Sequence, residues 1–278
     1  MILKVRKMEF SFADVPPHYC QGDACRTHLL NALLLLFAEG EQFFIRSVCC
    51  YQEELANDPE LTLAVKGFCA QEMQHARSHE MFYKMLEKQG YEIRPFLAKY
   101  ERIAFELQRI AFESGERRGS PLWNLYNLSV TAALEHFTAV AASRTFTTDL
   151  FEGVAPSVRE FLRWHAAEEI EHKSVAFDVL KKVDGRYSIR VAGLFLGSLS
   201  FLIAWSYATW SLLRQEKKIG VRGLATEIFL SVLVVLMGSG PYLKAALDYL
   251  RPSFHPNETD DAGLAAAYFA ETKARAVA

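Results

Sequence analysis

The sequence predicts an all-α protein built around a bundle of four long helices. Apolar residues recur with the 3.6-residue period of an amphipathic helix over most of the chain. Strand-like alternation is almost absent, and proline, glycine, asparagine and aspartate interrupt the helical pattern only at long intervals. These breaks leave four long helices, followed by two strongly apolar segments near the C-terminus.

The breaks also set the expected limits of each helix. Pro59, Pro121 and Pro156 each stand at a predicted helix start, where the missing N–H breaks no helical hydrogen bond, and Gly90 follows the second helix as a C-terminal cap. Residues 90–120 are numerous enough to cross from one end of a bundle to the other. The predicted bundle helices cover residues 25–55, 59–89, 121–147 and 156–183, and a shorter helix covers residues 95–114.

Length, charge and composition restrict the class of protein. The chain has 278 residues, is 51% hydrophobic and carries a formal net charge of −2. No stripe of lysine and arginine with interleaved aromatic residues is visible, so we expect no nucleic-acid partner. The N-terminus has no apolar run long enough for a secretory signal, and five cysteines form no disulfide framework. We therefore expect a cytoplasmic protein with reduced thiols.

Two histidines and two cysteines near the start of the first helix imitate a small zinc site: His18, Cys20, Cys25 and His28. Their spacing fits no standard zinc motif. We prefer to interpret them as ordinary residues at the entry to a helix and keep zinc as the alternative.

A repeated Glu-x-x-His motif is the main chemical signal in the chain. Glu72 and His75 lie in the segment FCAQEMQHARSHE, and Glu169 and His172 lie in WHAAEEIEHKS. Residues three positions apart on a helix point the same way. A buried carboxylate needs a cation, a metal or hydrogen bonds as a partner. The motif therefore predicts a pair of polar groups directed at one site.

Each of the other two long helices carries one glutamate in an apolar segment. Glu41 lies in LLLLFAEGEQFF, and Glu135 lies in VTAALEHFTAV. Glu41 precedes Asn57 by 16 residues and Glu72 follows Asn57 by 15, so an antiparallel hairpin places both carboxylates at about the same height. Glu135 and Glu169 stand at similar distances from the break between the last two bundle helices. The four glutamates are therefore expected to meet.

This combination is the ligand set of a dinuclear metal site in a four-helix bundle. The predicted ligands are Glu41, Glu72, His75, Glu135, Glu169 and His172. Four carboxylates and two imidazoles suit iron or manganese better than a closed tetrahedral zinc site. We expect two iron ions, with manganese or a mixed manganese–iron pair as alternatives. Neighbouring acids compete for two positions, Glu39 with Glu41 and Glu168 with Glu169.

Four more residues are expected to support the ligands or to add one: His79, His165, Glu168 and His136. His79 and His165 each lie one turn from a motif, on the same face. Because the second and fourth bundle helices should run antiparallel, both histidines fall on one side of the metal layer. Each could ligate a metal or hydrogen-bond a ligating carboxylate. The alternative is a core histidine satisfied by an acid such as Glu80.

The ligand pattern over residues 25–183 resembles that of the ferritin-like di-iron carboxylate proteins. The resemblance implies a ferritin-like bundle, with a long crossover between its second and third helices, and two iron ions on the six residues named above. A narrower resemblance covers nearly the whole chain. The segments QEMQHARSHE, EHFTA, HAAEEIEHKSVAFDV and FHPNETD, with the apolar C-terminal helices, look like the bacterial family of predicted metal-dependent hydrolases. That label alone does not establish hydrolysis.

Residues 191–213 and 228–243 are two apolar segments without a charged residue. The first is long enough to cross about 30 Å of hydrocarbon. We expect a membrane-inserted or monotopic hairpin at the inner face of the membrane; the alternative is packing on the bundle or on a second subunit in a homodimer. The expected organisation is a lead-in (1–24), the metal-binding bundle (25–187), the apolar hairpin (188–251) and a polar, Ala-rich tail (252–278).

These expectations favour an O₂-activating di-iron oxygenase or oxidase acting on a hydrophobic or lipid-like substrate. Its partners would be O₂ and an electron donor, and apolar surroundings would exclude water from the oxidised intermediate. The alternative is a metal-dependent hydrolase that uses a metal-bridged hydroxide. Iron storage or metal sensing is a third interpretation. Storage is disfavoured because ferritin-type cages need no long apolar C-terminal helices.

Overall fold

The computed structural model describes residues 3–112, 121–216 and 240–277, and these ranges are helical apart from turns, extended segments and one isolated β-bridge between Cys20 and Val154. The prediction of an all-α protein is confirmed. The described elements are α1 (Ala24–Cys49), α2 (Pro59–Lys88), α3 (Arg94–Phe112), α4 (Pro121–Thr147), α5 (Pro156–His172), α6 (Val175–Val183), α7 (Tyr187–Leu213), α9 (Gly240–Tyr249), the 3₁₀ turn η1 (Pro256–Glu258) and α10 (Ala262–Val277).

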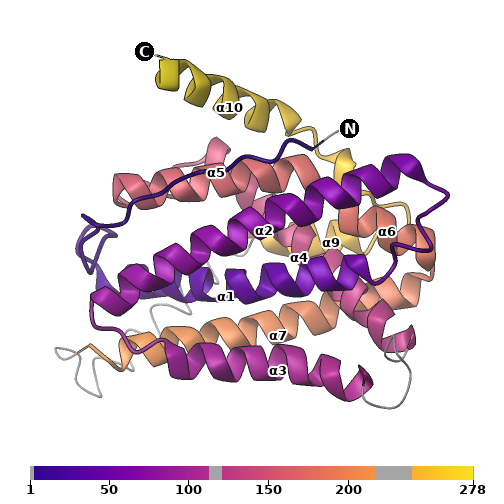
Figure 1. The fold of residues 1–278 in the computed structure, drawn as a ribbon, viewed down its shortest axis with the longest axis horizontal. Helices are drawn as coiled ribbons and strands as arrows, with labels where there is room; N and C mark the ends of the chain where they lie inside the picture. The colour runs from indigo at the N-terminus through magenta and orange to yellow at the C-terminus, as the bar shows by residue number, and fades with distance from the viewer. Residues whose placement is uncertain (1–2, 113–120, 217–239, 278) are drawn as a thin grey trace.

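Two helical hairpins form the bundle that holds the polar site. α1 packs along α2, and α4 packs along α5 and α6. Contacts of α1 with α4, and of α2 with α5 and α6, join the two hairpins (Figure 1). α3 and α7 lie side by side on the opposite side of α1 from α5 (Figure 1). The two hairpins therefore pack together as one four-helix bundle, in which α5 and α6 together take the place of the fourth helix.

Local sequence signals explain where the hairpin helices begin. The Asp23 carboxylate caps α1 by accepting a 2.9 Å hydrogen bond from the amide of Arg26. The Asp58 carboxylate caps α2 by accepting a 3.2 Å bond from the amide of Leu61. α2, α4 and α5 each start at the predicted proline. Gly90 has a φ of +94°, a value that glycine adopts at little cost, just after α2 ends.

Two helix limits differ from the prediction. α1 ends at Cys49 rather than near residue 55, and residues 50–57 form turns. Leu55 is only 1% exposed, and its carbonyl accepts bonds from the Asp58 amide and the Thr62 hydroxyl, both at 2.8 Å. The chain therefore turns here to place Leu55 in the core while it caps the entry to α2.

The predicted helix over residues 156–183 is broken after His172. Lys173 and Ser174 adopt turn geometry, and α6 restarts at Val175. The Lys173 ammonium is buried, donates a 2.7 Å bond to the Thr259 carbonyl and pairs with the Asp261 carboxylate. This attachment to the C-terminal segment accounts for the break. Because it is a tertiary interaction, the local sequence needs no proline or glycine at this point.

α7 is attached to the bundle by one face. At its closest approach, the backbone of Gly193 lies against Ser129 of α4, so that a Cβ at position 193 would lie 2.0 Å from the Ser129 hydroxyl. The opposite face exposes Phe195, Leu199 and Ile203 by 59–63%. Residues 228–239 of the second apolar segment lie outside the described residues. α7 is long and apolar enough to cross a membrane, and 22% of its most apolar 18-residue window is buried.

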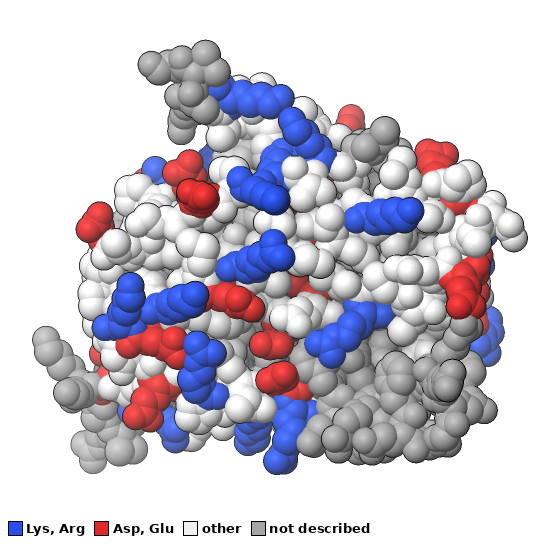
Figure 2. All heavy atoms as spheres, in the orientation of Figure 1, with Lys and Arg blue, Asp and Glu red and all other residues white. Residues whose placement is uncertain are grey.

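The chain before α1 and the chain after α9 both pack on the bundle. Phe10 and Phe12 of the extended N-terminal segment contact Phe161 of α5, with ring centroids 5.2 and 5.7 Å apart. α10 also packs on α5. The N-terminal segment therefore runs along α5 beneath α10 (Figure 1). On the face shown in Figure 2, described residues of both charge signs are interspersed.

Candidate metal centre

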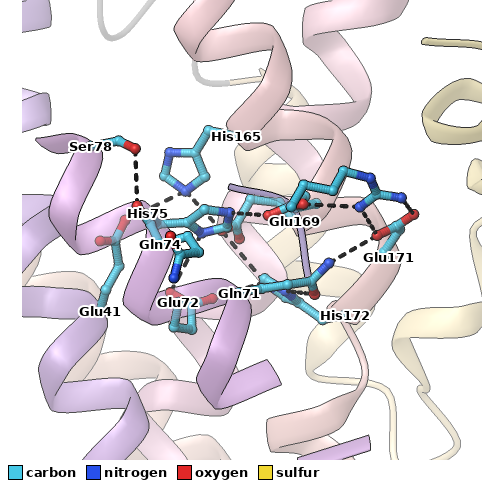
Figure 3. Close-up of polar contacts among 12 residues, drawn as sticks. Glu41, Gln71, Glu72, Gln74, His75, Ser78, His165, Glu169, Glu171 and His172 are labelled. Carbon is cyan, nitrogen blue, oxygen red and sulfur yellow. Dashed lines mark hydrogen bonds and ion pairs between the residues drawn. The ribbon is translucent and has the colours of Figure 1, made fainter. Parts of the chain in front are cut away.

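The six predicted ligands meet in the middle of the bundle. α1 contributes Glu41, α2 contributes the first Glu-x-x-His pair, α4 contributes Glu135 and α5 contributes the second pair. None of the six is more than 5% exposed. Figure 3 shows Glu41, Glu72, His75, Glu169 and His172 directed at one another. Helical spacing and antiparallel pairing therefore bring together four carboxylates and two imidazoles from distant parts of the chain.

The glutamates of the two motifs lie between the two imidazoles. The Nδ1 atom of His75 lies 3.7 Å from Glu72 Oε2 and 3.5 Å from Glu169 Oε1. The Nε2 atom of His172 lies 3.0 Å from Glu72 Oε1 and 3.5 Å from Glu169 Oε1. Glu135 Oε2 is also 3.5 Å from His172 Nε2. Each of these two carboxylates, Glu72 and Glu169, therefore lies within 3.7 Å of both imidazoles.

Most donor atoms of this cluster are buried without a hydrogen-bond partner among the described residues. They are both carboxylate oxygens of Glu41, Glu72 and Glu135, Oε2 of Glu169, Nδ1 of His75 and Nε2 of His172. A buried polar atom that lacks a partner is costly, and native proteins rarely leave so many together. Coordination of cations by these atoms would satisfy them. The residues present therefore fit a metal centre.

The electrostatics of the cluster depend on the balance between burial and neighbouring charges. Burial, followed by the Glu72 carboxylate, raises the pKa of Glu41 well above its usual range. Burial and then the Glu169 carboxylate do the same to the pKa of Glu135. Burial acts to lower the pKa of His172, but Glu169 and Glu72 outweigh it and hold that pKa well above normal. Burial and like charge thus favour the neutral form of the Glu41 and Glu135 carboxyls, and a bound cation would oppose this effect.

His79 and His165 lie together on the Glu41 side of the cluster. Their facing atoms, His79 Nε2 and His165 Nδ1, are 3.2 Å apart. His165 Nε2 is 2.9 Å from Glu169 Oε1, and Glu41 Oε1 is 3.3 Å from His79 Nε2. Both imidazoles are buried, whereas Glu80, the alternative partner, is exposed. The structure places both histidines within contact distance of candidate ligands, and their role as ligands or supports stays a prediction.

Of the other two residues expected to support the ligands, Glu168 contacts the cluster and His136 does not. Glu168 is fully buried and its Oε2 atom accepts a 3.0 Å hydrogen bond from His75 Nε2, on the side of the ring away from Glu169. His136 lies outside the cluster, because its Nε2 atom bonds the Ala245 carbonyl at 3.0 Å. Successive helical positions point about 100° apart, so His136 cannot share the direction of Glu135. The expected contact of His136 with the ligands is therefore corrected.

Two residues that contact the site were not predicted. Gln71 Oε1 lies 3.1 Å from His172 Nδ1, and Gln71 Nε2 donates a 2.9 Å bond to Glu171. The Arg6 guanidinium lies 2.9 Å from Glu168 and 2.8 Å from Glu171. The sequence offers one weak signal for Gln71, which is a polar residue directly before Glu72. No sequence signal identifies Arg6, which lies far from the motifs along the chain.

The four-residue zinc site considered near the N-terminus does not appear among the groups of donor atoms, within the described residues, that could hold a metal ion. His18 and His28 do form such a group, but its third member is Glu216. Glu216 Oε1 lies 2.9 Å from His18 Nε2 and 2.7 Å from His28 Nε2, and it accepts a 2.8 Å bond from Tyr91. His28 Nδ1 lies 3.3 Å from the Asn31 amide nitrogen. These groups satisfy one another, in contrast to the central cluster.

Comparison with known protein families gives one match. The family model described as predicted metal-dependent hydrolase covers residues 4–260, which include every residue of the cluster. The chain belongs to this family. The resemblance inferred from the motifs is therefore confirmed, while membership of the ferritin-like superfamily stays a prediction. No curated protein and no solved structure gives a significant match. The family description indicates a metal-dependent hydrolase, and the clustered histidines and glutamates could bind metal ions.

Proposed function

We propose that the protein is a metal-dependent hydrolase with a dinuclear centre in its helical bundle. The observation that carries this proposal is the group of buried, unpartnered donor atoms in a chain of the predicted metal-dependent hydrolase family. The ligands we propose are Glu41, Glu72, His75, Glu135, Glu169 and His172. Two of the groups of donor atoms that lie within 4.8 Å of one another support two metal positions: Glu41, Glu72 and His75, and Glu72, Glu169 and His172. Two further groups in the cluster include His165.

The chain's own residues would shape the reaction in two ways. Bound metal ions would supply Lewis acidity and lower the pKa of a bound water. Aromatic rings exclude bulk water from the imidazoles, since Trp164 lies 4.9 Å from His75, Phe68 lies 5.0 Å from His172 and Phe37 lies 5.0 Å from His79, measured between ring centroids. His165 would hold the Glu169 carboxylate in place through its Nε2 atom, which lies 2.9 Å from Glu169 Oε1. The result is a dry, oriented donor set.

An O₂-activating oxygenase or oxidase is the second candidate. The observation that favours it is the donor set itself, because four carboxylates and two imidazoles suit iron or manganese and occur in di-iron bundle proteins. We propose iron or manganese as the native metal on the same ground. This candidate would also require an electron donor.

The exposed apolar face of α7 supports a proposal about substrate and location. Phe195, Leu199 and Ile203 lie on this face, and α7 passes the length and composition criteria for a membrane span. We propose a hydrophobic or lipid-like substrate and contact with the inner face of the membrane. A homodimer that covers this face is the competing arrangement.

One experiment separates the two candidate reactions. Metal-free protein is loaded anaerobically with Fe²⁺ or Mn²⁺ and divided in two. One part is assayed for hydrolysis of aryl esters and phosphoesters of increasing chain length. The other part receives O₂ and is followed by optical spectroscopy. Metal-dependent hydrolysis supports the hydrolase. Transient charge-transfer bands without hydrolysis would overturn it in favour of the oxygenase.

A further inference from the structure

We propose that Arg6 is a positioning residue that determines which nitrogen of each motif histidine faces the metal positions. The inference rests on the proposed metal centre, but it concerns residues that supply no ligand. Arg6 lies in the extended N-terminal segment, 162 residues before Glu168 in the chain. Its effect would pass through hydrogen bonds to both Glu-x-x-His motifs.

Arg6 holds two acidic residues of α5 at once. Its Nη1 atom donates to Glu168 Oε1 at 2.9 Å and to Glu171 Oε2 at 2.8 Å, and its Nη2 atom donates to Glu171 Oε1 at 2.8 Å. The grip on Glu171 is bidentate, which is the strongest and most directional form of a carboxylate–guanidinium contact. The Arg6 side chain is only 17% exposed, so water competes little for these bonds.

The first branch of the hydrogen-bond network determines which nitrogen of His75 carries the proton. The second oxygen of Glu168, Oε2, lies 3.0 Å from His75 Nε2. An ionised carboxylate only accepts hydrogen bonds, so Nε2 must carry the proton. The lone pair of a neutral His75 then lies on Nδ1, the buried, unpartnered atom that faces Glu72 and Glu169.

The second branch fixes His172. Gln71 Nε2 donates to Glu171 Oε2 at 2.9 Å and to the Lys4 carbonyl at 3.2 Å. Both partners are acceptors, so the amide must turn its Oε1 atom toward His172 Nδ1, 3.1 Å away. Nδ1 therefore carries the proton and Nε2 is left for the metal. Figure 3 shows Gln71 between Glu171 and His172.

The two motifs thus direct different nitrogens at the metal positions, Nδ1 of His75 and Nε2 of His172. Each of these orientations is set by a chain of hydrogen bonds that begins at Arg6. The C-terminal helix closes this arrangement from outside, because the Phe269 ring of α10 lies 3.4 Å from the Arg6 guanidinium carbon. Lysine could replace the charge of Arg6 but not its planar two-branched geometry. The N-terminal segment and α10 therefore act on the metal centre without touching it.

The test compares Arg6→Gln and Arg6→Lys with Lys7→Gln, a control that removes the same charge from an exposed position of the same segment. Metal-free proteins are titrated with Mn²⁺, and the electron paramagnetic resonance signal of free Mn²⁺ reports binding. Arg6→Gln should weaken Mn²⁺ affinity about 10–100-fold, the usual effect of losing a group that orients metal ligands. Arg6→Lys should recover part of the loss, and Lys7→Gln should match the wild type.

Melting of the metal-free proteins separates positioning from general destabilisation. A positioning role predicts weaker Mn²⁺ binding even where Arg6→Gln and wild type melt at similar temperatures. If Arg6→Gln does not fold, the variant Gln71→Met takes its place in the test. This variant removes only the hydrogen bonds that link Glu171 to His172, so it should weaken one of the two Mn²⁺ binding steps. Wild-type Mn²⁺ affinity in the folded variants would overturn the role of Arg6. A wild-type protein that binds no Mn²⁺, Fe²⁺ or Zn²⁺ would instead overturn the metal centre itself.

Discussion

The imidazole of His79 lies 3.2 Å from that of His165, with Nε2 of the first facing Nδ1 of the second. The pair comes from α2 and α5, and both rings lie next to Glu41. Each histidine is one helical turn from a Glu-x-x-His motif, and the two turns extend in the same direction in space because α2 and α5 are antiparallel. This pair gives the metal cluster one histidine-rich side and one side bounded by Glu135.

We predict that His79→Ala or His165→Ala lowers activity more than metal content. The two rings contact Glu41 and Glu169, two of the proposed ligands, and loss of such a contact typically costs about 10–100-fold in activity or metal affinity. His75→Ala, which removes a proposed ligand, should abolish both. Metal analysis and metal-dependent turnover of the same preparations check this. A variant at His79 that loses a full equivalent of metal would instead make His79 a ligand.

The second prediction concerns metal content. Wild-type protein should bind close to two iron or manganese ions per chain, because Glu72 belongs to two groups of converging donor atoms, one with Glu41 and His75 and one with Glu169 and His172. The double variant Glu72→Ala, His172→Ala should lose most of this metal, measured by elemental analysis. Glu80→Ala, on the exposed side of α2, is the matched control. One zinc ion per chain, retained in the double variant, would contradict the site assignment.

Most of the central site could be predicted because its information is local. A Glu-x-x-His spacing fixes one helix face, and distances from a turn fix the height of Glu41 and Glu72. The contribution of Arg6 could not be predicted, because it depends on where an extended segment crosses α5. The break in the helix at Lys173 could not be predicted either, because it is caused by a tertiary contact with Asp261.

His136 was predicted to support the site but lies outside it. Its place beside Glu135 in the sequence made it look like part of the site, but adjacent helical residues diverge by about 100°. The ring instead packs on Tyr249 and Phe254, with centroids 5.4 and 4.8 Å away. Sequence adjacency on a helix is therefore a poorer guide to a shared site than a spacing of three or four.

The third prediction concerns α7. If its exposed apolar face inserts into lipid, the protein should pellet with membranes and stay there in 1 M salt, because apolar insertion is not screened as charge pairing is. Replacing Phe195, Leu199 and Ile203 by glutamine should release it to the soluble fraction. Glutamine at Leu63, Leu122 and Leu150, which are exposed on other helices and loops, is the control. Wild-type protein that is soluble and monodisperse without detergent would show that protein covers this face.

The last prediction concerns the cysteines, none of which forms a disulfide. The sulfur atoms of Cys49 and Cys69 lie 3.2 Å apart, at the end of α1 and in α2. The hydrogen bond with Cys69 lowers the pKa of Cys49 to about 6, against the opposing effect of burial. Burial raises the pKa of the neighbouring Cys50, although Cys50 is the more exposed residue.

A thiolate is the reactive form of cysteine, so a lowered pKa gives reactivity at lower pH. At pH 7, iodoacetamide should therefore alkylate Cys49 before Cys50, as located by peptide mass spectrometry. The Cys49 rate should rise with pH to half its maximum near pH 6. Cys69→Ala removes the hydrogen bond and should move that midpoint toward about 8.5, the value of an ordinary thiol. Cys50→Ala should leave it unchanged. An unshifted Cys49 midpoint in Cys69→Ala would show that the contact between the two sulfur atoms does not stabilise the thiolate.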